Sequence, residues 1–288
     1  MRLQGIEAEV KGKKGLIGDL MKAYIEILRP SVCALSAFAV AIGCLLAGQS
    51  NVFIISIAML SAALAAGGGN VLNDIFDLDV DKINKPKRPL PSGRITLKGA
   101  KKYAAALLLI AAIGFLMLPL YSLALGMFNI LVIYFYSSHA KRTPFASFVD
   151  SWLSASTFLF GSLTTGHVLP AVIILTCMAY AANVGRELAK AIEDMKGDAA
   201  NKVRSLPLVL GRNAAILLSI SFVSLAIVLS PLPFLLNIFN LYYMALVLVA
   251  DVLFFASLWL LFVSATKSQK MMKVAMFIAL LAFISGVF

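Results

Sequence analysis

Nine long stretches of the chain carry little charge, and each is about long enough to cross a lipid bilayer. A hydrocarbon core about 30 Å thick is crossed by roughly 20 apolar residues in an α-helix. Of the 288 residues, 61% are hydrophobic and 14% are charged, whereas soluble domains are about half apolar and a quarter charged. The sequence therefore predicts an all-α, multi-pass membrane protein, and it excludes a secreted or nuclear globular one. The nine expected spans are residues 31–47, 52–72, 102–120, 121–138, 147–166, 169–190, 213–230, 238–263 and 271–288.

The 25 Lys and Arg residues indicate how these spans are oriented. All of them lie before the first span or in and around the second, fourth, sixth and eighth connections, hence on one face of the membrane. The other connections, AGQSN, LPLYS, TGHVLP and SPLPFLLNIFN, contain none. The positive-inside rule makes the basic face cytoplasmic. The net charge of +11 then reflects topology and an attraction for anionic headgroups or substrates, not a nucleic-acid surface.

The first 30 residues lack the pattern of a cleaved signal peptide, because charge is spread throughout them. Within them, GLIGDLMKAYIEIL is typical of a short amphipathic helix at the membrane surface. We therefore treat residues 1–288 as a single transmembrane domain. Its parts of functional interest are an N-terminal cytoplasmic segment at 1–29, an acid-rich motif with its loop at 73–101, and a second such region at 187–212.

A pattern of acidic and basic residues occurs twice, each time where a predicted span ends. The pattern is D-x-x-x-D-x-x-N-K-x-[KR], at residues 77–87 and 194–204. Four spans separate the copies, so both lie on one face, as in parallel repeats that meet around a central cavity. The alternative is that these side chains merely solvate a cytoplasmic loop. The members are Asp77, Asp81, Asn84, Lys85 and Lys87 in the first copy, and Asp194, Asp198, Asn201, Lys202 and Arg204 in the second.

The spacing of the acids suits a hard cation. Side chains four residues apart share one face of a helix, so each motif forms a stripe of oxygen ligands, which favours Mg²⁺ completed by substrate phosphates. Zinc and copper are not expected, because His139 and His167 fall on opposite faces and no Cys is close. The adjacent Lys and Arg suit a diphosphate, so the substrate is expected to be ionic at one end and apolar at the other. The expected metal ligands are Asn73, Asp74, Asp77, Asp81, Asp194 and Asp198.

Three segments resemble the motifs of one enzyme family. NDIFDLDVDKINKPKRPLPSGRI, from residue 73, resembles the NDxxDxxxD motif and following loop of the UbiA superfamily of intramembrane prenyltransferases. RELAKAIEDMKGD and SLPLVLG are similar to its second motif, and YFYSSHAKRTPF to its loop after the fourth helix. The resemblance implies nine transmembrane helices around a central cavity that opens laterally to lipid. It also implies Mg²⁺-dependent transfer of an isoprenoid from its diphosphate to an acceptor.

The resemblance assigns further roles by matching position. It places Tyr136 beside the reacting carbon. The chain departs from the family pattern at Ala191 and Lys196, where many members carry acids, and this bears on the second metal site. The residues that the resemblance gives to the diphosphate are Arg88, Lys85, Lys141, Arg142 and Arg204. The residues expected to carry catalysis are Asp77, Asp81, Asp194, Asp198, Lys141 and Tyr136.

The first motif is most similar to that of the archaeal lipid branch of this superfamily. That branch transfers geranylgeranyl from geranylgeranyl diphosphate to geranylgeranylglyceryl phosphate. The alternative is an aromatic, quinone-precursor acceptor, and a more remote alternative is an ion or solute transporter. The allylic cation is expected to be shielded by aromatic faces such as Phe76, Tyr134 or Tyr136. Asp251, alone within the eighth predicted span, is expected to be paired or functional.

Overall fold

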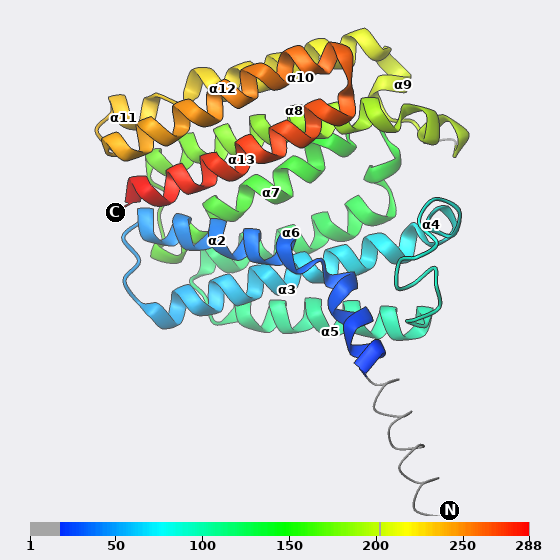
Figure 1. Cartoon of the computed structure of the whole chain (residues 1–288). Coiled ribbons are helices and arrows are strands. Elements are labelled where there is room, and N and C mark those ends of the chain that lie inside the picture. Colours follow the sequence, from blue (N-terminus) through cyan, green and yellow to red (C-terminus); the bar gives the residue numbers. More distant parts are fainter. Residues whose placement is uncertain (1–17, 202, 288) are drawn as a thin grey trace, which may run out of the picture.

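The computed structural model describes residues 18–201 and 203–287, and all regular structure in them is helical (Figure 1). The elements are a helix at Gly18–Leu28 followed by α2 (Pro30–Leu46), α3 (Val52–Phe76), α4 (Leu78–Asn84), α5 (Leu97–Leu116), α6 (Leu120–Ser138), η1 (Ala140–Arg142), α7 (Ala146–Ser162), η2 (Leu163–Thr165), α8 (Pro170–Ala200), α9 (Leu206–Leu210), α10 (Arg212–Leu229), α11 (Leu232–Leu235), α12 (Leu241–Val263) and α13 (Ala265–Val287).

Seven of these elements are long and apolar enough to cross a membrane: α3, α5, α6, α8, α10 together with α11, α12 and α13. The helix Gly18–Leu28 and α2 form a pair bent by 48°, which would make an eighth span. α7 coincides with the remaining predicted span, and its 17 residues are at the short end of what crosses a hydrocarbon core. The prediction of an all-α, multi-pass membrane protein is confirmed.

The predicted N-terminal segment 1–29 is described only from residue 18, since residues 1–17 lie outside the described part. Residues 18–28 form the expected short helix with one buried face. Ala23 and Ile27 are buried, whereas Met21 and Ile25 are more than half exposed. The buried pair packs against a cluster from α3 and α5, so the helix is fixed to the bundle by its apolar face.

The helices form two groups that lie side by side (Figure 1). α2, α3, α5 and α6 make the first group, and α8, α10, α12 and α13 make the second. α7 packs against both α2 and α8 and so joins the groups. Their interiors contain many small residues, such as Ala58 and Ala111 in the first group and Ala215 and Ala275 in the second. Small side chains allow the close helix contacts on which association in lipid depends.

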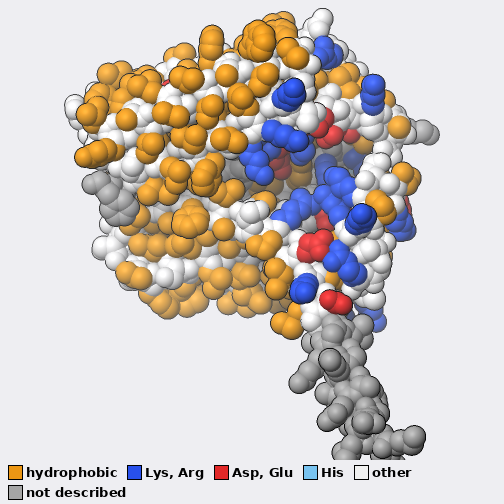
Figure 2. Space-filling model, viewed as in Figure 1, with side chains coloured by type: hydrophobic (Ala, Val, Ile, Leu, Met, Phe, Trp, Pro, Cys, Tyr) orange, Lys and Arg blue, Asp and Glu red, His pale blue; other side chains and the backbone are white. Residues whose placement is uncertain are grey.

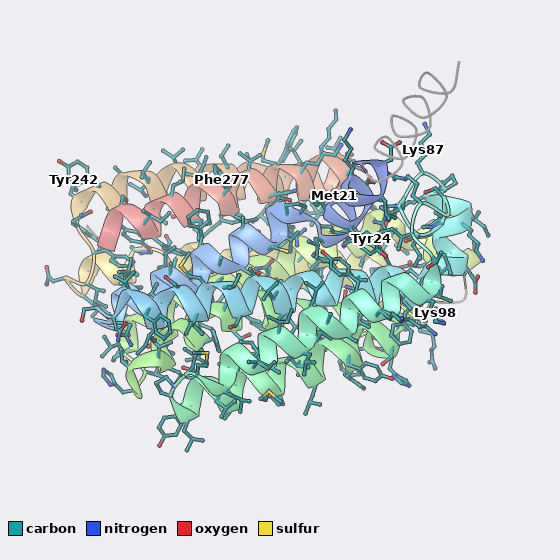
Figure 3. All side chains as sticks on the ribbon, turned by 90° about the horizontal axis from the view of Figure 1, so that it is seen from below. Met21, Tyr24, Lys87, Lys98, Tyr242 and Phe277 are labelled. Atoms are coloured by element: carbon teal, nitrogen blue, oxygen red, sulfur yellow. The ribbon has the colours of Figure 1, made fainter. Side chains whose placement is uncertain are left out.

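Large apolar side chains cover the flanks of the bundle (Figure 2). Phe255 and Trp259 of α12 are 73% and 69% exposed, as expected of surfaces that face lipid rather than water. Charged groups gather at one end. In Figure 3, Lys87 and Lys98 lie at that end, Tyr242 lies at the opposite end, and Phe277 lies on the flank between them.

α2 and α7 approach each other backbone to backbone at two glycines. A Cβ atom on Gly161 would overlap the Val40 carbonyl oxygen, and one on Gly43 would overlap the Phe158 carbonyl oxygen. Because the obstructing atoms are backbone atoms, no side chain can move aside to make room. The contact by which α7 is joined to the first helix group therefore depends on these glycines.

We expect Gly161→Ala to lower the stability of the detergent-solubilised protein by about 1–3 kcal/mol, since overpacking has a cost of this order. The measurement is thermal unfolding followed by circular dichroism. Gly197→Ala is the matched control, because Gly197 is also helical but a Cβ there meets nothing within 4 Å. Helix propensity predicts that this control is neutral or slightly stabilising. Equal melting temperatures for both variants would contradict the role of the α2–α7 contact.

Candidate active site

The first acidic motif lies where α3 gives way to the short helix α4. α3 ends at Phe76 and α4 begins at Leu78, with Asp77 at the junction. The helical hydrogen-bond pattern nevertheless continues through it. The Asp77 amide donates to the Asn73 carbonyl at 3.0 Å, and the Asp81 amide donates to the Asp77 carbonyl at 2.8 Å. These three residues therefore keep the four-residue register that the spacing predicts.

Two arginines neutralise the most deeply buried carboxylates of this motif. Arg88 Nη1 donates to Asp81 Oδ2 at 2.6 Å and to Asp74 Oδ1 at 3.2 Å. Arg29 Nη2 also donates to Asp74 Oδ1, at 2.6 Å. The Asp74 and Asp81 side chains are only 3% and 5% exposed. A buried carboxylate without a partner is strongly destabilising, so these ion pairs explain how two acids remain at a largely apolar helix end.

Arg29 is a site residue that the sequence-based reasoning missed. It lies at the bend between Gly18–Leu28 and α2, with a positive φ of 55°, a conformation uncommon for residues other than glycine. Pro30 disfavours a helical conformation at the residue before it, which accounts for the break. The Leu28 carbonyl next to the bend accepts a hydrogen bond from Asn70 Nδ2 at 2.8 Å. The signal in the sequence was an arginine directly before the proline that opens the first span.

The segment after α6 brings a third cation to the motif. Lys141 of η1 forms an ion pair with Asp77. The neighbouring Arg142 guanidinium donates to the Phe76 carbonyl at 3.3 Å, and the Arg142 carbonyl accepts from the Arg204 amide at 3.1 Å. This loop is therefore held between the first motif and the segment that follows α8.

The second motif is helical, because α8 continues to Ala200 instead of ending near residue 190 as predicted. Asp194 is exposed and Asp198 is half-buried. Lys85 lies close enough to Asp194, and Lys141 close enough to Asp198, for their charges to interact. The two motifs thus face one another across one opening with these lysines between them. Lys202, which the repeated pattern includes, lies outside the described residues.

Basic side chains crowd the rim of this opening (Figure 2). Partial desolvation of its ammonium group, followed by the neighbouring cation Arg88, lowers the pKa of Lys85, although Asp81 opposes the shift. Repulsion among neighbouring cations is relieved when an anion binds between them. The rim therefore favours a highly charged anionic group such as a diphosphate.

A second ionic group on α8 was also missed. Glu187 is 7% exposed and forms ion pairs with Arg186 and, at 3.2 Å, with Lys190. The sequence reading treated these two cations only as topology signals. The sequence feature that could have revealed this group is that all three charged residues fall inside the predicted span 169–190. Ionisable side chains within a span are usually functional or paired.

A cavity of about 140 Å³ lies beneath the opening. All of its lining residues come from α2, α3, α5, α6 and α7, with none from α8, so the cavity lies in the first helix group and α7 rather than between two repeats. It extends from Asn73 and Tyr136 near the motif to Phe115 and Phe160 at the far end, whose rings meet edge to face with centroids 5.2 Å apart. Its walls are largely apolar, and its mouth is polar.

The aromatic residues expected at the reacting carbon divide into two sets. Tyr136 is 8% exposed and lines the cavity near its mouth. Phe76 and Tyr134 instead pair with each other, with centroids 6.1 Å apart, and neither lines the cavity. Both side chains are exposed, and their shielding of the substrate stays a prediction.

The donor atoms at the mouth of the cavity are of the chemical type that Mg²⁺ prefers. They are carboxylate and amide oxygens, and the buried Oδ1 atom of Asn73 has no hydrogen-bond partner. Among the residues that the structure describes, no three acidic, His or Cys side chains converge closely enough to hold an ion as they stand. The reason is visible in the ion pairs, since Arg29, Arg88 and Lys141 already engage the acids of the first motif.

Comparison with known proteins agrees with this architecture. The model of the UbiA prenyltransferase family matches residues 34–281. The chain belongs to this family. Among similar proteins is digeranylgeranylglyceryl phosphate synthase of Methanocaldococcus jannaschii, 36% identical over 280 residues, which cover 94% of this chain and 98% of that one. The Methanosarcina barkeri enzyme of the same name is 38% identical over 286 residues, with 93% and 99% covered.

Solved structures show the same helical fold. A structure of digeranylgeranylglyceryl phosphate synthase superposes with a TM-score of 0.78 at 36% identity, covering 93% of this chain and 98% of that one. A UbiA homologue from Archaeoglobus fulgidus bound to GPP and Mg²⁺ superposes with a TM-score of 0.70 at 19% identity, covering 92% and 98%. Because the sequence identity to this homologue is only 19%, its similarity is evidence for the fold alone.

Three other polar residues lie apart from this prenyltransferase site. His139 is exposed and stacks on Phe135, and His167 lies between η2 and α8 at the opposite end of the bundle. Asp251 accepts a hydrogen bond from Ser230 Oγ, so the partner expected for this acid within a span is a serine.

Proposed function

We propose that this UbiA prenyltransferase transfers a geranylgeranyl group from geranylgeranyl diphosphate to geranylgeranylglyceryl phosphate, in the synthesis of archaeal membrane lipids. The observation that carries the reaction class is the placement of paired acids and cations at the mouth of an apolar cavity. The acceptor is supported by the identity of 36% to 38%, over nearly the whole chain, to enzymes with that name.

The diphosphate would lie at the rim between the two motifs. Arg88, Lys85 and Lys141 would bind its oxygens, with Arg142 and Arg204 at the edge. Each of these cations carries more than one hydrogen-bond donor, and charge-assisted hydrogen bonds are the strongest ones available to a diphosphate. Arg29 would belong to the same set, since it donates to the same Asp74 oxygen as Arg88.

Bound Mg²⁺ would supply charge neutralisation to the departing diphosphate. The residues that would hold it are Asn73, Asp74, Asp77 and Asp81 of the first motif and Asp194 and Asp198 of the second. Asn73 offers an oxygen that is already buried and unbonded. The acids of the first motif would exchange their present Arg and Lys partners for the metal, which would leave those cations available to the diphosphate.

The prenyl chain would enter the cavity headed by Tyr136. A cavity of about 140 Å³ is smaller than the pockets of about 300 Å³ or more that hold drug-sized ligands. It therefore suits only the first part of a long isoprenoid, and the remainder would leave between helices into lipid. Nine spans, with α2 and α7 both crossing, would place the basic rim on the cytoplasmic side.

The test is an assay of purified protein with labelled geranylgeranyl diphosphate, Mg²⁺ and a panel of acceptors. We expect a prenylated glyceryl phosphate and an equal amount of diphosphate, with no product when the metal is chelated. If a hydroxybenzoate-type acceptor gave product and the glyceryl phosphate gave none, the acceptor would be the aromatic compound and our proposal for it would be wrong. Solute flux into proteoliposomes without any turnover would instead indicate a transporter.

A further inference from the structure

Asp150 is an acid that the proposed reaction has not used. It lies in the second turn of α7 and lines the cavity at the end that also contains Asn73 and Tyr136. The residue keeps part of its accessible surface, and its position in the lining directs that surface into the cavity. It belongs to neither acidic motif.

The groups around Asp150 come from three elements. Tyr136 on α6 lines the same cavity and lies close to the Asp150 carboxylate. Its charged neighbours are Lys141 on η1 and Arg186, Glu187 and Lys190 on α8. Both α8 cations are already engaged by Glu187, and Lys141 is engaged by Asp77.

This arrangement leaves Asp150 without a direct ion pair among the described residues, unlike Asp74, Asp77, Asp81 and Glu187. Asp194 and Asp198 also lack ion pairs in that part of the chain, but they lie at the rim and outside the cavity lining. Asp150 is therefore the one described acid that both faces the cavity and is not already bound by a cation.

The reaction proposed above needs a group of this kind. Transfer breaks the bond between C1 of the prenyl group and the diphosphate oxygen, and the electron pair leaves with the diphosphate. A new bond forms between C1 and the acceptor hydroxyl oxygen, which must then lose its proton. The first-motif acids cannot readily take that proton, because cations or the metal engage them.

We propose that Asp150 is the catalytic residue that accepts the proton of the acceptor hydroxyl. The carboxylate would approach the hydroxyl oxygen beside Tyr136, take the proton as the carbon–oxygen bond forms, and release it to water at the rim. This role rests on the proposed function. It extends that function by naming a base outside both acidic motifs.

The test compares the wild-type chain with Asp150→Asn and Asp150→Glu in the transfer assay. We expect Asp150→Asn to lower the transfer rate about 100-fold, since general bases contribute factors of this order. Ionisation is measured separately, as the scrambling of ¹⁸O between the bridging and non-bridging positions of labelled geranylgeranyl diphosphate. That scrambling should remain within about threefold of wild type, because it needs no proton acceptor. Asp150→Glu should recover part of the transfer rate.

The pH profile separates a base from a merely structural residue. The wild-type transfer rate should fall at acid pH as the carboxyl becomes protonated, and the Asp150→Asn profile should lack this limb. Asp251→Asn is the matched control, because Asp251 is also an aspartate within a helix but contacts Ser230 in the other helix group. It should keep both the rate and the acid limb of the wild type.

Two results would overturn the role of Asp150 while leaving the proposed function intact. One is wild-type transfer by Asp150→Asn, and the other is slow transfer that keeps the wild-type acid limb or loses ¹⁸O scrambling to the same extent. A wild-type chain that prenylates no acceptor at all would instead overturn the proposed function, and the base with it.

Discussion

Replacing Asp77 with asparagine is expected to lower Mg²⁺-dependent transfer by about a thousandfold. This factor corresponds to roughly 4 kcal/mol of transition-state stabilisation, a contribution typical of a metal that neutralises a leaving group. Asp77 lies at the junction of α3 and α4 and pairs with Lys141. In the proposed reaction its carboxylate would therefore serve both the metal and the position of a lysine that binds the diphosphate. The amide keeps the size of the side chain but loses its charge. The measurement is the rate of diphosphate release across a Mg²⁺ titration.

Asp79→Asn is the control for this experiment. Asp79 lies two residues further along the same motif, but its side chain is 94% exposed and contacts only the exposed Lys82. It should retain the wild-type rate and Mg²⁺ dependence. If Asp77→Asn kept both as well, the stripe of acids would not be the metal site.

Replacing Arg88 with glutamine is expected to affect stability and activity together. Arg88 bridges Asp74 and Asp81, which are almost wholly buried, and removal of a partner from buried charges costs about 3–5 kcal/mol. The melting temperature without metal should therefore fall. Added Mg²⁺ should restore much of it, because the ion would neutralise the same carboxylates. Transfer should fall about 100-fold even with metal, with a raised KM for the prenyl diphosphate, since a bidentate donor to phosphate is lost.

The control is Arg94→Gln. Arg94 forms a bidentate pair with Glu26, at 2.7 Å and 3.1 Å, but both side chains are substantially exposed. Exposed pairs contribute at most about 1 kcal/mol, so this variant should differ little from wild type, and its melting temperature should not respond to Mg²⁺ more than that of wild type. A melting temperature of Arg88→Gln that Mg²⁺ leaves unchanged would contradict a shared site for the arginine and the metal.

Most helix positions could be predicted because each depends on local composition. Each predicted span coincides for most of its length with one helix, since an apolar stretch of this length has few other stable arrangements in lipid. The register of Asn73, Asp77 and Asp81 was also predictable, because helix geometry places residues four apart on one face. The break at Asp77 and the extension of α8 to Ala200 were not, as polar sequence there is compatible with either helix or loop.

The sequence by itself determined the multi-pass helical fold, the gathering of the charges at one end of the bundle and the family, because these follow from long apolar blocks and from motifs written in consecutive residues. Only the tertiary structure decided which groups meet. Arg29 reaches Asp74 across 45 positions of the chain, and Asp150 reaches the cavity from a helix whose sequence gives no sign of a site. The pairing of Phe76 with Tyr134 likewise joins residues of different helices. Contacts between distant residues depend on how helices pack against each other, which no local pattern specifies.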